Sequence, residues 1–328
     1  MNLAVALSEY QLLQVQAVTN HYNIDDLNLI ILNKDRIKPF LIDNERYTDI
    51  LVLPTLSSSL WKRALKSHIE KYENILEEYF ANKNTDIFIG GADENVIFNY
   101  IKKLADPMYY WNIEEGLANY SGHTWAFKLI IFIKIKVYKH IYGFDIPTAY
   151  GQGQVECDKS FRMAPSISTG GDDHLELALL LKDYIKVKAR ELKKEISFSE
   201  DLSNVSTLVI STLSHFSKNK IVNNDPATVY KFHPYDEIKN NIGVRYIEEK
   251  VPLEIVPLMM PNLQKIRFNV PSTSLLSISC MDLDVKIEVD FESIELKHSI
   301  WQYIVNANDF DHVYEYISKK FEHKVTFL

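Results

Sequence analysis

A histidine lies directly before a proline in the segment "VYKFHPYDEIKNNIG" (229–243). Proline disfavours the helical conformation for the residue before it, so His233 is expected to be extended. Pro234 suits the first position of a helix, and Asp236 and Glu237 would complement the positive end of that helix. An imidazole beside the free N–H groups of a helix start can bind an anion. The segment therefore indicates either an anion site or, more commonly for such a pattern alone, an ordinary strand-to-helix corner with a surface histidine.

Carboxylates occur in two further places where they could do chemistry. Glu114 and Glu115 precede Gly116 after the strand-like run 108–113, and a carboxylate at such a strand end can act as a general base. A charged surface turn is the simpler interpretation of this motif by itself. Glu254 is a single acid within an apolar run, where a carboxylate needs hydrogen-bond donors. A ribose diol, a backbone turn or a surface position would each supply them.

Three hydroxyl residues, Ser272, Thr273 and Ser274, follow Pro271 and precede a run that can form a helix. Ser and Thr at a helix start accept hydrogen bonds from backbone N–H groups, and together with those groups they can hold a phosphate. Simple capping is the slightly more common explanation for such a cluster. Both explanations predict that a helix begins close to these residues.

Two acidic segments are only weak candidates for metal binding. Asp282 and Asp284 have the DxD spacing of metal-dependent sugar transferases, but segment 281–291 alternates apolar and polar residues. This alternation favours the solvent-facing side of a strand. The segment "GGDDH" (170–174) is more simply a loop followed by a helix cap. The sequence contains neither a Walker-type lysine loop for phosphate nor the GxSxG elbow of a nucleophilic serine.

These residues lie near the ends of elements that alternate between strand and helix. Apolar runs typical of buried parallel strands alternate with stretches of helical spacing, and the alternation restarts after a linker near 196–204. This order predicts an α/β fold of two Rossmann-like domains, 1–200 and 201–328, facing a cleft, with ligands at the carboxyl ends of the strands. The expected strands are 2–7, 27–32, 49–54, 85–91, 108–113, 205–212 and 228–232. The expected helices are 8–22, 58–83, 94–105 and 174–195, and 145–174 is expected to be a loop.

Bulk composition narrows the class of protein. The 328 residues carry a formal net charge of −8, and this acidic balance argues against nucleic-acid binding. Cys157 and Cys280 form neither a zinc pattern nor a disulfide framework, which fits a reducing, cytoplasmic setting. The first residues lack the basic region of a typical signal peptide.

Lysines are interleaved with large apolar residues in "FKLIIFIKIKVYKH" (127–140). Peripheral contact with the anionic inner face of a membrane is one interpretation of this pattern. A core helix or strand with solvated lysines is the more common structure. The run is too short and too charged to span a bilayer.

The order of the three motifs resembles a known family. Glu114–Glu115–Gly116, then His233–Pro234, then Glu254 and the Ser–Thr–Ser cluster follow one another as in the bacterial sialyltransferase superfamily, which includes lipooligosaccharide sialyltransferases and capsular polysialyltransferases. The opening "NLAVALSEYQLLQVQAV" also looks like the first strand and helix of that group. The resemblance implies a GT-B fold and an inverting, metal-independent transfer of sialic acid from CMP-sialic acid to a glycan hydroxyl, such as the terminal galactose of a bacterial surface glycan.

The resemblance also implies which residues do the chemistry. Glu115, the acid directly before the glycine, would be the general base of the N-terminal, acceptor-side domain. His233 and the cluster of Ser272, Thr273 and Ser274 would hold the CMP phosphate in the C-terminal, donor-binding domain. The cluster departs from the family's pattern because it contains three hydroxyl residues rather than a pair, so two of the three remain to be assigned to the phosphate.

Two further residues would contact the donor by the same resemblance. Glu254 looks like the residue that grips the cytidine ribose, and Lys231 resembles a donor-contacting lysine. Ser211 and Thr212 end a strand that would face the same cleft, and they are weaker candidates. No cofactor besides the CMP-sialic acid donor is implied, and the expected partner is an oligosaccharide or lipid-linked glycan acceptor.

Three other functions stay open at this point. The donor could be another CMP-activated acid such as Kdo. The chain could be a metal-dependent sugar transferase that uses Asp282 and Asp284. It could also be a noncatalytic carbohydrate-binding protein with a GT-B shape, although the presence of all three motifs argues against that function.

Overall fold

The computed structural model divides the chain into two compact units. The first is formed mainly by Met1–Tyr184, and the second begins at Ile185 within helix α6 (Leu177–Glu195) and includes the C-terminal Asp311–Leu328. The structure describes residues 1–32, 37–54, 67–92, 95–114, 120, 136, 139–140, 157–168, 174–196, 198, 200–213, 216, 225–232, 236, 242–249, 251–270, 272–290 and 311–328.

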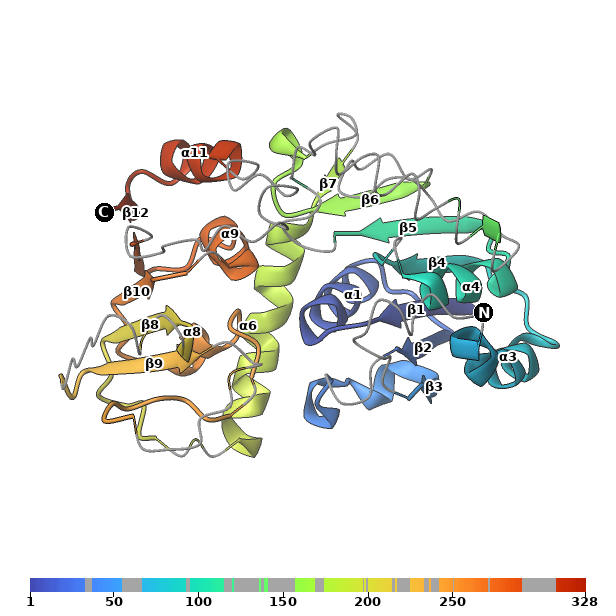
Figure 1. The fold of residues 1–328 in the computed structure, drawn as a ribbon, viewed down its shortest axis with the longest axis horizontal. Coiled ribbons are helices and arrows are strands. Elements are labelled where there is room, and N and C mark those ends of the chain that lie inside the picture. Colours follow the sequence, from blue (N-terminus) through green and yellow to red (C-terminus); the bar gives the residue numbers. More distant parts are fainter. Residues whose placement is uncertain are drawn as a thin grey trace. The chain divides into compact units, whose positions relative to one another are not determined.

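The first unit contains a sheet of seven parallel strands in the order β3-β2-β1-β4-β5-β6-β7, which Figure 1 shows from β3 at the bottom to β7 at the top. The chain therefore moves outward from β1 in one direction and then returns to its other side at β4, as in doubly wound α/β folds. The strands are β1 (Asn2–Ala6), β2 (Leu27–Ile31), β3 (Tyr47–Val52), β4 (Ile87–Gly90), β5 (Tyr109–Ile113), β6 (Lys159–Arg162) and β7 (His174–Glu176).

Helices α1 (Glu9–His21), α3 (Ser67–Phe80) and α4 (Val96–Ala105) accompany this sheet in the first unit, and α6 begins in it. Helix α1 begins after Ser8, whose side chain accepts a hydrogen bond from the Gln11 N–H, and α4 begins after Asn95, which caps it in the same way. These polar caps satisfy N–H groups that have no partner inside the helix. Short 3-10 turns lie at Pro39–Leu41, Asn44–Arg46 and Pro165–Ile167.

Strand β1 is buried on both faces. Leu3 and Val5 belong to a core cluster that also contains residues of α3 and α4. Because side chains alternate along a strand, Ala4 and Ala6 lie on the opposite face. Helix α1 contacts β1, β4 and β5, and the small alanines allow a helix to approach the sheet closely.

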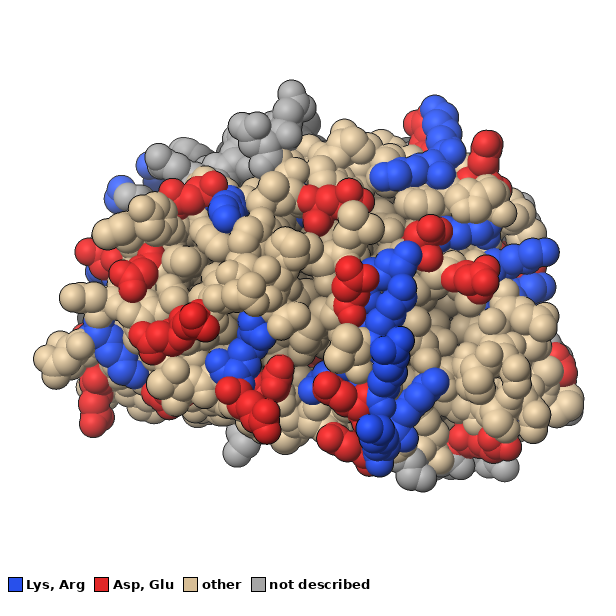
Figure 2. Space-filling view, turned by 180° about the vertical axis from the view of Figure 1, so that it is seen from behind, with Lys and Arg blue, Asp and Glu red and all other residues tan. Residues whose placement is uncertain are grey.

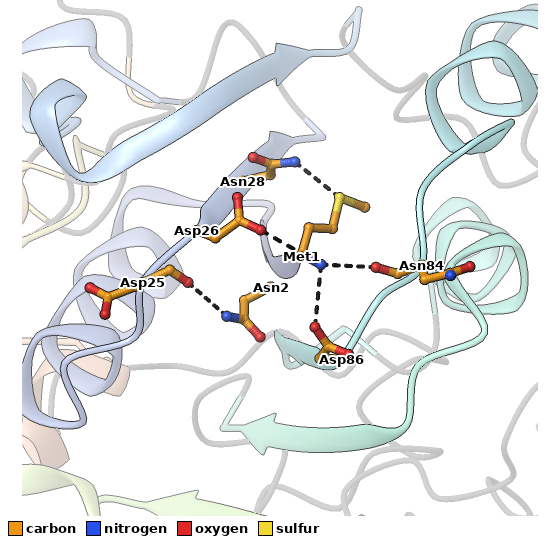
Figure 3. A network of polar contacts seen from close by, with 7 residues as sticks. All are labelled: Met1, Asn2, Asp25, Asp26, Asn28, Asn84 and Asp86. Carbon is orange, nitrogen blue, oxygen red and sulfur yellow. Dashed lines mark hydrogen bonds and ion pairs between the residues drawn. The ribbon is translucent and has the colours of Figure 1, made fainter.

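The start of β1 is tied to two neighbouring segments of the first unit (Figure 3). The Met1 amino group donates a hydrogen bond of 2.9 Å to the Asn84 carbonyl oxygen and forms ion pairs with Asp86 at 3.3 Å and Asp26 at 3.7 Å. The Asn2 side chain donates to the carbonyl oxygen of Asp25 at 2.7 Å. These contacts come from the segments directly before β2 and β4, so they fix the end at which all three strands begin.

The second unit contains five parallel strands in the order β12-β11-β10-β8-β9. Here the chain changes direction on either side of β8, because β9 pairs with one edge of β8 and β10 with the other. The strands are β8 (Thr207–Ser211), β9 (Thr228–Phe232), β10 (Lys265–Phe268), β11 (Lys286–Val289) and β12 (Val325–Phe327). Its described helices include the second half of α6, α8 (Val256–Met259), α9 (Thr273–Cys280) and α11 (Asp311–Lys320).

The two parallel sheets confirm the expected α/β fold with two Rossmann-like units. One expectation is wrong: the segment 145–174 is not all loop, because it contains β6 and the first residue of β7. Helix α6 accordingly begins at Leu177 rather than at His174. Strand β6 escapes sequence patterns because Ser160 and Arg162 are buried polar residues in a run of only four.

Charge is unevenly distributed over the surface. Figure 2 shows one face of the molecule, where acidic and basic side chains both occur and several of the basic ones form a vertical band while others are scattered. Clusters of cations therefore exist on a chain whose formal net charge is −8. Among the described residues, no helix is both long enough and apolar enough to cross a bilayer.

Candidate active site

The carboxyl edge of the second sheet brings together the ends of the strands that precede two of the sequence motifs. Phe232 of β9 pairs with Ser211 of β8, and Phe268 of β10 pairs with Ile210 of β8. The end of β9 therefore lies beside the end of β8, and His233 is the next residue in the chain after Phe232. Ligands of parallel α/β sheets bind at this edge, where the strand order reverses.

The corner that holds His233 is bounded by two described residues, although His233 and Pro234 themselves lie outside the described residues. Phe232 ends β9, and the Asp236 carboxylate accepts a hydrogen bond of 2.9 Å from the Leu213 N–H. Leu213 lies just after β8. The chain on both sides of His233 is therefore anchored close to the end of β8.

The hydroxyl cluster forms the first turn of α9. Ser272 is extended and caps the helix, because its side-chain oxygen accepts a hydrogen bond of 3.2 Å from the Ser274 N–H. Thr273 and Ser274 are the first helical residues, and all three are half-buried. Capping by Ser272 is thus confirmed, and the cluster lies only a few residues beyond the end of β10.

Asn269 lies between β10 and this helix start. Its N–H donates to the Ile210 carbonyl oxygen at 2.9 Å, so it lies next to the end of β8. Its side chain is buried, and the side-chain oxygen has no hydrogen-bond partner in the described part of the chain. Sequence reasoning did not select this residue, because a single asparagine after a strand is common in turns.

Glu254 is buried just before α8 and contacts the same helix as the hydroxyl cluster. Its Oε1 accepts a hydrogen bond of 2.9 Å from the Ser277 hydroxyl. Burial raises the pKa of Glu254 above its ordinary value, and hydrogen bonds from the side chains of Ser274 and Ser277 partly offset this increase. Glu254 and Ser274, two residues expected from the sequence to bind the CMP-sugar donor, are therefore adjacent in the structure.

The side chain of Lys231 is directed elsewhere. Its ammonium group is nearly buried and donates a hydrogen bond of 2.7 Å to the Glu249 carbonyl oxygen. Side chains alternate along β9, so Lys231 points to the opposite face of the sheet from Tyr230 and Phe232, whose rings stack with centroids 5.8 Å apart. Lys231 therefore lies one residue before the carboxyl end of β9, and its side chain is not directed to the hydroxyl cluster.

In the first unit, Glu114 is fully buried at the carboxyl end of β5. Its Oε1 accepts a hydrogen bond of 3.0 Å from the Tyr10 hydroxyl, and its Oε2 accepts one of 2.7 Å from the Met163 N–H. The Tyr120 hydroxyl also donates to Oε2. Burial raises the pKa of Glu114, while these three donors and the charge of Arg162 partly offset the increase.

A wider polar network surrounds Glu114. Arg162 of β6 is buried. It donates a hydrogen bond of 2.6 Å to the Asn112 side-chain oxygen and one of 2.9 Å to the Phe161 carbonyl oxygen. The Tyr120 hydroxyl accepts a hydrogen bond of 3.0 Å from the Ala164 N–H. The network joins the ends of β5 and β6 to helix α1, so it holds the point at which the chain leaves β5.

Glu115, the sequence-predicted base, lies outside the described residues. Its neighbour Glu114 cannot reach an acceptor sugar without breaking three hydrogen bonds, because its carboxylate is fully enclosed. Tyr10, Tyr120 and Arg162 were missed by sequence reasoning, and no motif marks them.

The DxD residues do not form a metal-ligand cluster in the described structure. Asp282 has a left-handed backbone (φ 50°), and its carboxylate forms an ion pair with Lys324 at 2.8 Å. Both acids lie in the turn between α9 and β11 rather than on the strand, which corrects the expected position. No group of three His, Cys, Asp or Glu side chains suited to a metal ion occurs among the described residues. Residues 170–173 lie outside that part of the chain.

No protein-family model matches the sequence, and a search of curated proteins finds no match. Solved structures similar to this chain include Spinosyn Forosaminyltransferase SpnP, with 8% identity over 99% of this chain and 95% of that one (TM-score 0.48). The glycotransferase of kitacinnamycin is 7% identical over 99% and 84% (TM-score 0.49), and the glycosyltransferase SnogD from Streptomyces nogalater is 10% identical over 99% and 96% (TM-score 0.44). At these TM-scores and identities the likenesses carry no argument about activity, and the α/β assignment rests on the two sheets themselves.

Proposed function

We propose that the protein is an inverting, metal-independent sialyltransferase of the GT-B type, which moves sialic acid from CMP-sialic acid to a glycan hydroxyl. The observation that carries this proposal is the convergence at the carboxyl edge of the second sheet. The end of β9, which leads into His233, lies beside the end of β8, and the capped start of α9 follows the end of the neighbouring β10.

This edge suits a phosphate that gains charge. Breaking the bond between the sugar and the phosphate of CMP moves negative charge onto the phosphate. Hydrogen-bond donors fixed where the charge develops are usually the largest catalytic contribution. In the proposal, the His233 imidazole, hydroxyls among Ser272, Thr273 and Ser274, and the positive N-terminal end of α9 stabilise that charge.

Glu254 would bind the ribose of the cytidine. It is buried and already shares hydroxyl donors with α9, so a ribose diol would extend a hydrogen-bond pattern that the carboxylate has at rest. Lys231 would contribute to donor binding through its positive charge near the end of β9. It would not contact the donor directly, since its ammonium group is held by the Glu249 carbonyl oxygen.

The first domain, 1–200 in this proposal, would bind the acceptor, and the second, 201–328, would bind the donor. Glu115 would remove the proton from the acceptor hydroxyl as that oxygen attacks the anomeric carbon and the CMP phosphate leaves. The enclosed environment of Glu114 supports Glu115 as the base by elimination, because three protein donors already hold the Glu114 carboxylate.

A donor panel tests this function. The full chain is incubated with a terminal galactoside and, separately, with CMP-sialic acid, CMP-Kdo or UDP-glucose, each with and without EDTA, and nucleotide release is followed. Release of CMP from CMP-sialic acid that depends on the galactoside and persists in EDTA is the expected result. Turnover only with CMP-Kdo, turnover only with UDP-glucose, a strict need for metal, or CMP binding without turnover would each overturn the proposal.

A further inference from the structure

Helix α6 carries an exposed row of cations in the second unit. Lys186, Arg190, Lys193 and Lys194 are exposed, and they define what we call the α6 basic stripe. Spacings of four and three residues bring side chains to one side of a helix, so Lys186, Arg190 and Lys193 lie in a row with Lys194 at its border. Lys182 continues the row one turn earlier in the sequence.

The cations of the α6 basic stripe have no ion-pair partner among the described residues. None of the four forms an ion pair or a hydrogen bond within the part of the chain that the structure describes. On the same helix, Glu191 forms an ion pair with Lys188 at 3.4 Å. Four free cations therefore lie within about three turns of helix on a protein that is acidic as a whole.

Two exposed apolar side chains accompany this row. Val187 lies at its border and is 53% exposed, and Leu179, seven residues before Lys186, lies in line with the row and is 56% exposed. A helix whose outer face carries both cations and exposed aliphatic side chains is suited to lie on an anionic lipid surface, where the apolar groups enter the headgroup layer. A flexible acidic polymer in solution would use the cations but would gain little from Val187 and Leu179.

We propose that the α6 basic stripe docks the protein on an anionic lipid surface. Charge complementarity supplies most of the attraction, and Val187 and Leu179 add apolar contact. This inference does not depend on the proposed donor or on Glu115. It also differs from the sequence-based expectation for 127–140, of which only Lys136, Lys139 and His140 are described, all of them exposed.

The test is flotation of the full chain with vesicles of phosphatidylcholine and phosphatidylglycerol in equal parts, and with vesicles of phosphatidylcholine alone. Each basic side chain near an anionic surface contributes about a fivefold increase in partitioning. Four of them would give several hundredfold, and the nearby Asp183 and Glu191 reduce this value. We expect the quadruple variant K186Q/R190Q/K193Q/K194Q to lower partitioning into the anionic vesicles by about 100-fold.

A matched control removes four exposed lysines from four other elements: K71Q/K103Q/K286Q/K320Q. It changes the net charge equally and should leave partitioning within about threefold of the wild-type value, because its cations are dispersed. Lys193 and Lys194 also stabilise α6, because cations complement the negative C-terminal end of a helix, so thermal melts of both variants check the fold. Val187→Ser in an otherwise wild-type chain is a second test that leaves all charges in place.

Three results would overturn the proposal. The wild-type protein could fail to float with anionic vesicles, both quadruple variants could lose binding equally, or dextran sulfate could bind as tightly as the vesicles while Val187→Ser partitions as the wild type does. The last outcome would assign the stripe to an acidic polymer. If the K186Q/R190Q/K193Q/K194Q variant has lost its fold, a lack of effect of Val187→Ser on partitioning still counts against the lipid surface.

Discussion

Replacing Glu114 tests whether the buried network organises the end of β5. In Glu114→Ala, the donors from Tyr10, Tyr120 and Met163 lose their acceptor. A buried donor without a partner costs about 1–3 kcal/mol. Tyr10 is only half-buried, so water can replace its partner, whereas the other two donors are enclosed. We therefore expect the free energy of unfolding to fall by about 3 kcal/mol.

Glu114→Gln should cost less. A glutamine can place its carbonyl oxygen where Oε2 accepts from Tyr120 and Met163, and its amide group can donate to the Tyr10 hydroxyl, which is able to accept. The loss is then mainly the charge-assisted part of these hydrogen bonds, about 1 kcal/mol. The free energy of unfolding should therefore be lowest for Glu114→Ala, intermediate for Glu114→Gln and highest for the wild type. This order distinguishes the loss of the hydrogen-bond network from the loss of the charge alone.

Urea unfolding followed by far-UV circular dichroism and tryptophan fluorescence measures these differences. Trp111 lies in β5 and is buried, so fluorescence reports on the affected sheet. Glu78→Ala is the control, because Glu78 is exposed on α3 and surface changes usually stay within about 0.5 kcal/mol. If Glu114→Ala unfolds within that range of the wild type, the network does not hold the end of β5 and our reasoning about it is wrong.

Three further changes test other parts of the structure. Gly91→Ala would place a Cβ atom 1.7 Å from the Ile113 carbonyl oxygen, so we expect a destabilisation of about 1–3 kcal/mol, and an unchanged melt would show that this close approach is absent. Ser272→Ala removes the cap on the Ser274 N–H and should cost about 1 kcal/mol in chemical denaturation; no loss would exclude the cap. Burial raises the pKa of Glu254 above its ordinary 4.5, so protonation of this carboxyl group favours the folded state. The stability of the wild type relative to Glu254→Gln should therefore fall as pH rises from about 4.5 through the raised pKa. A relative stability that increases over this pH range would contradict the direction of the shift.

Much of the fold follows from local patterns in the sequence. Strands such as β1 and β2 are continuous apolar runs, and α1 and α4 begin after residues of types that commonly cap helices. Strand β6 has no such signal, since it is four residues long and carries Arg162 in a buried position. Burial of the Arg162 side chain is tolerated because Asn112, 50 residues earlier, supplies a hydrogen-bond acceptor. Partners so distant in sequence cannot be read from local spacing.

The candidate site divides in the same way. The helix start at Ser272 was predictable from residue type, and Glu254 was expected to need donors, although Ser277 as one of them was not foreseen. The sequence did not reveal that Glu114 is enclosed. That enclosure depends on Tyr10 and Met163, which are 104 and 49 residues away from Glu114.

Product analysis with a base variant tests the central proposal most directly. A labelled terminal galactoside is incubated with CMP-sialic acid and either the wild-type chain or Glu115→Gln, and the product mass is measured over time alongside CMP affinity and the thermal melt. With the wild type we expect a mass increase of at least one sialyl residue. In the same assay we expect a rate about 100–10,000-fold lower with Glu115→Gln, at unchanged CMP affinity and stability. Absence of a sialylated product with the folded wild type, or equal rates for the two proteins, would contradict the proposal.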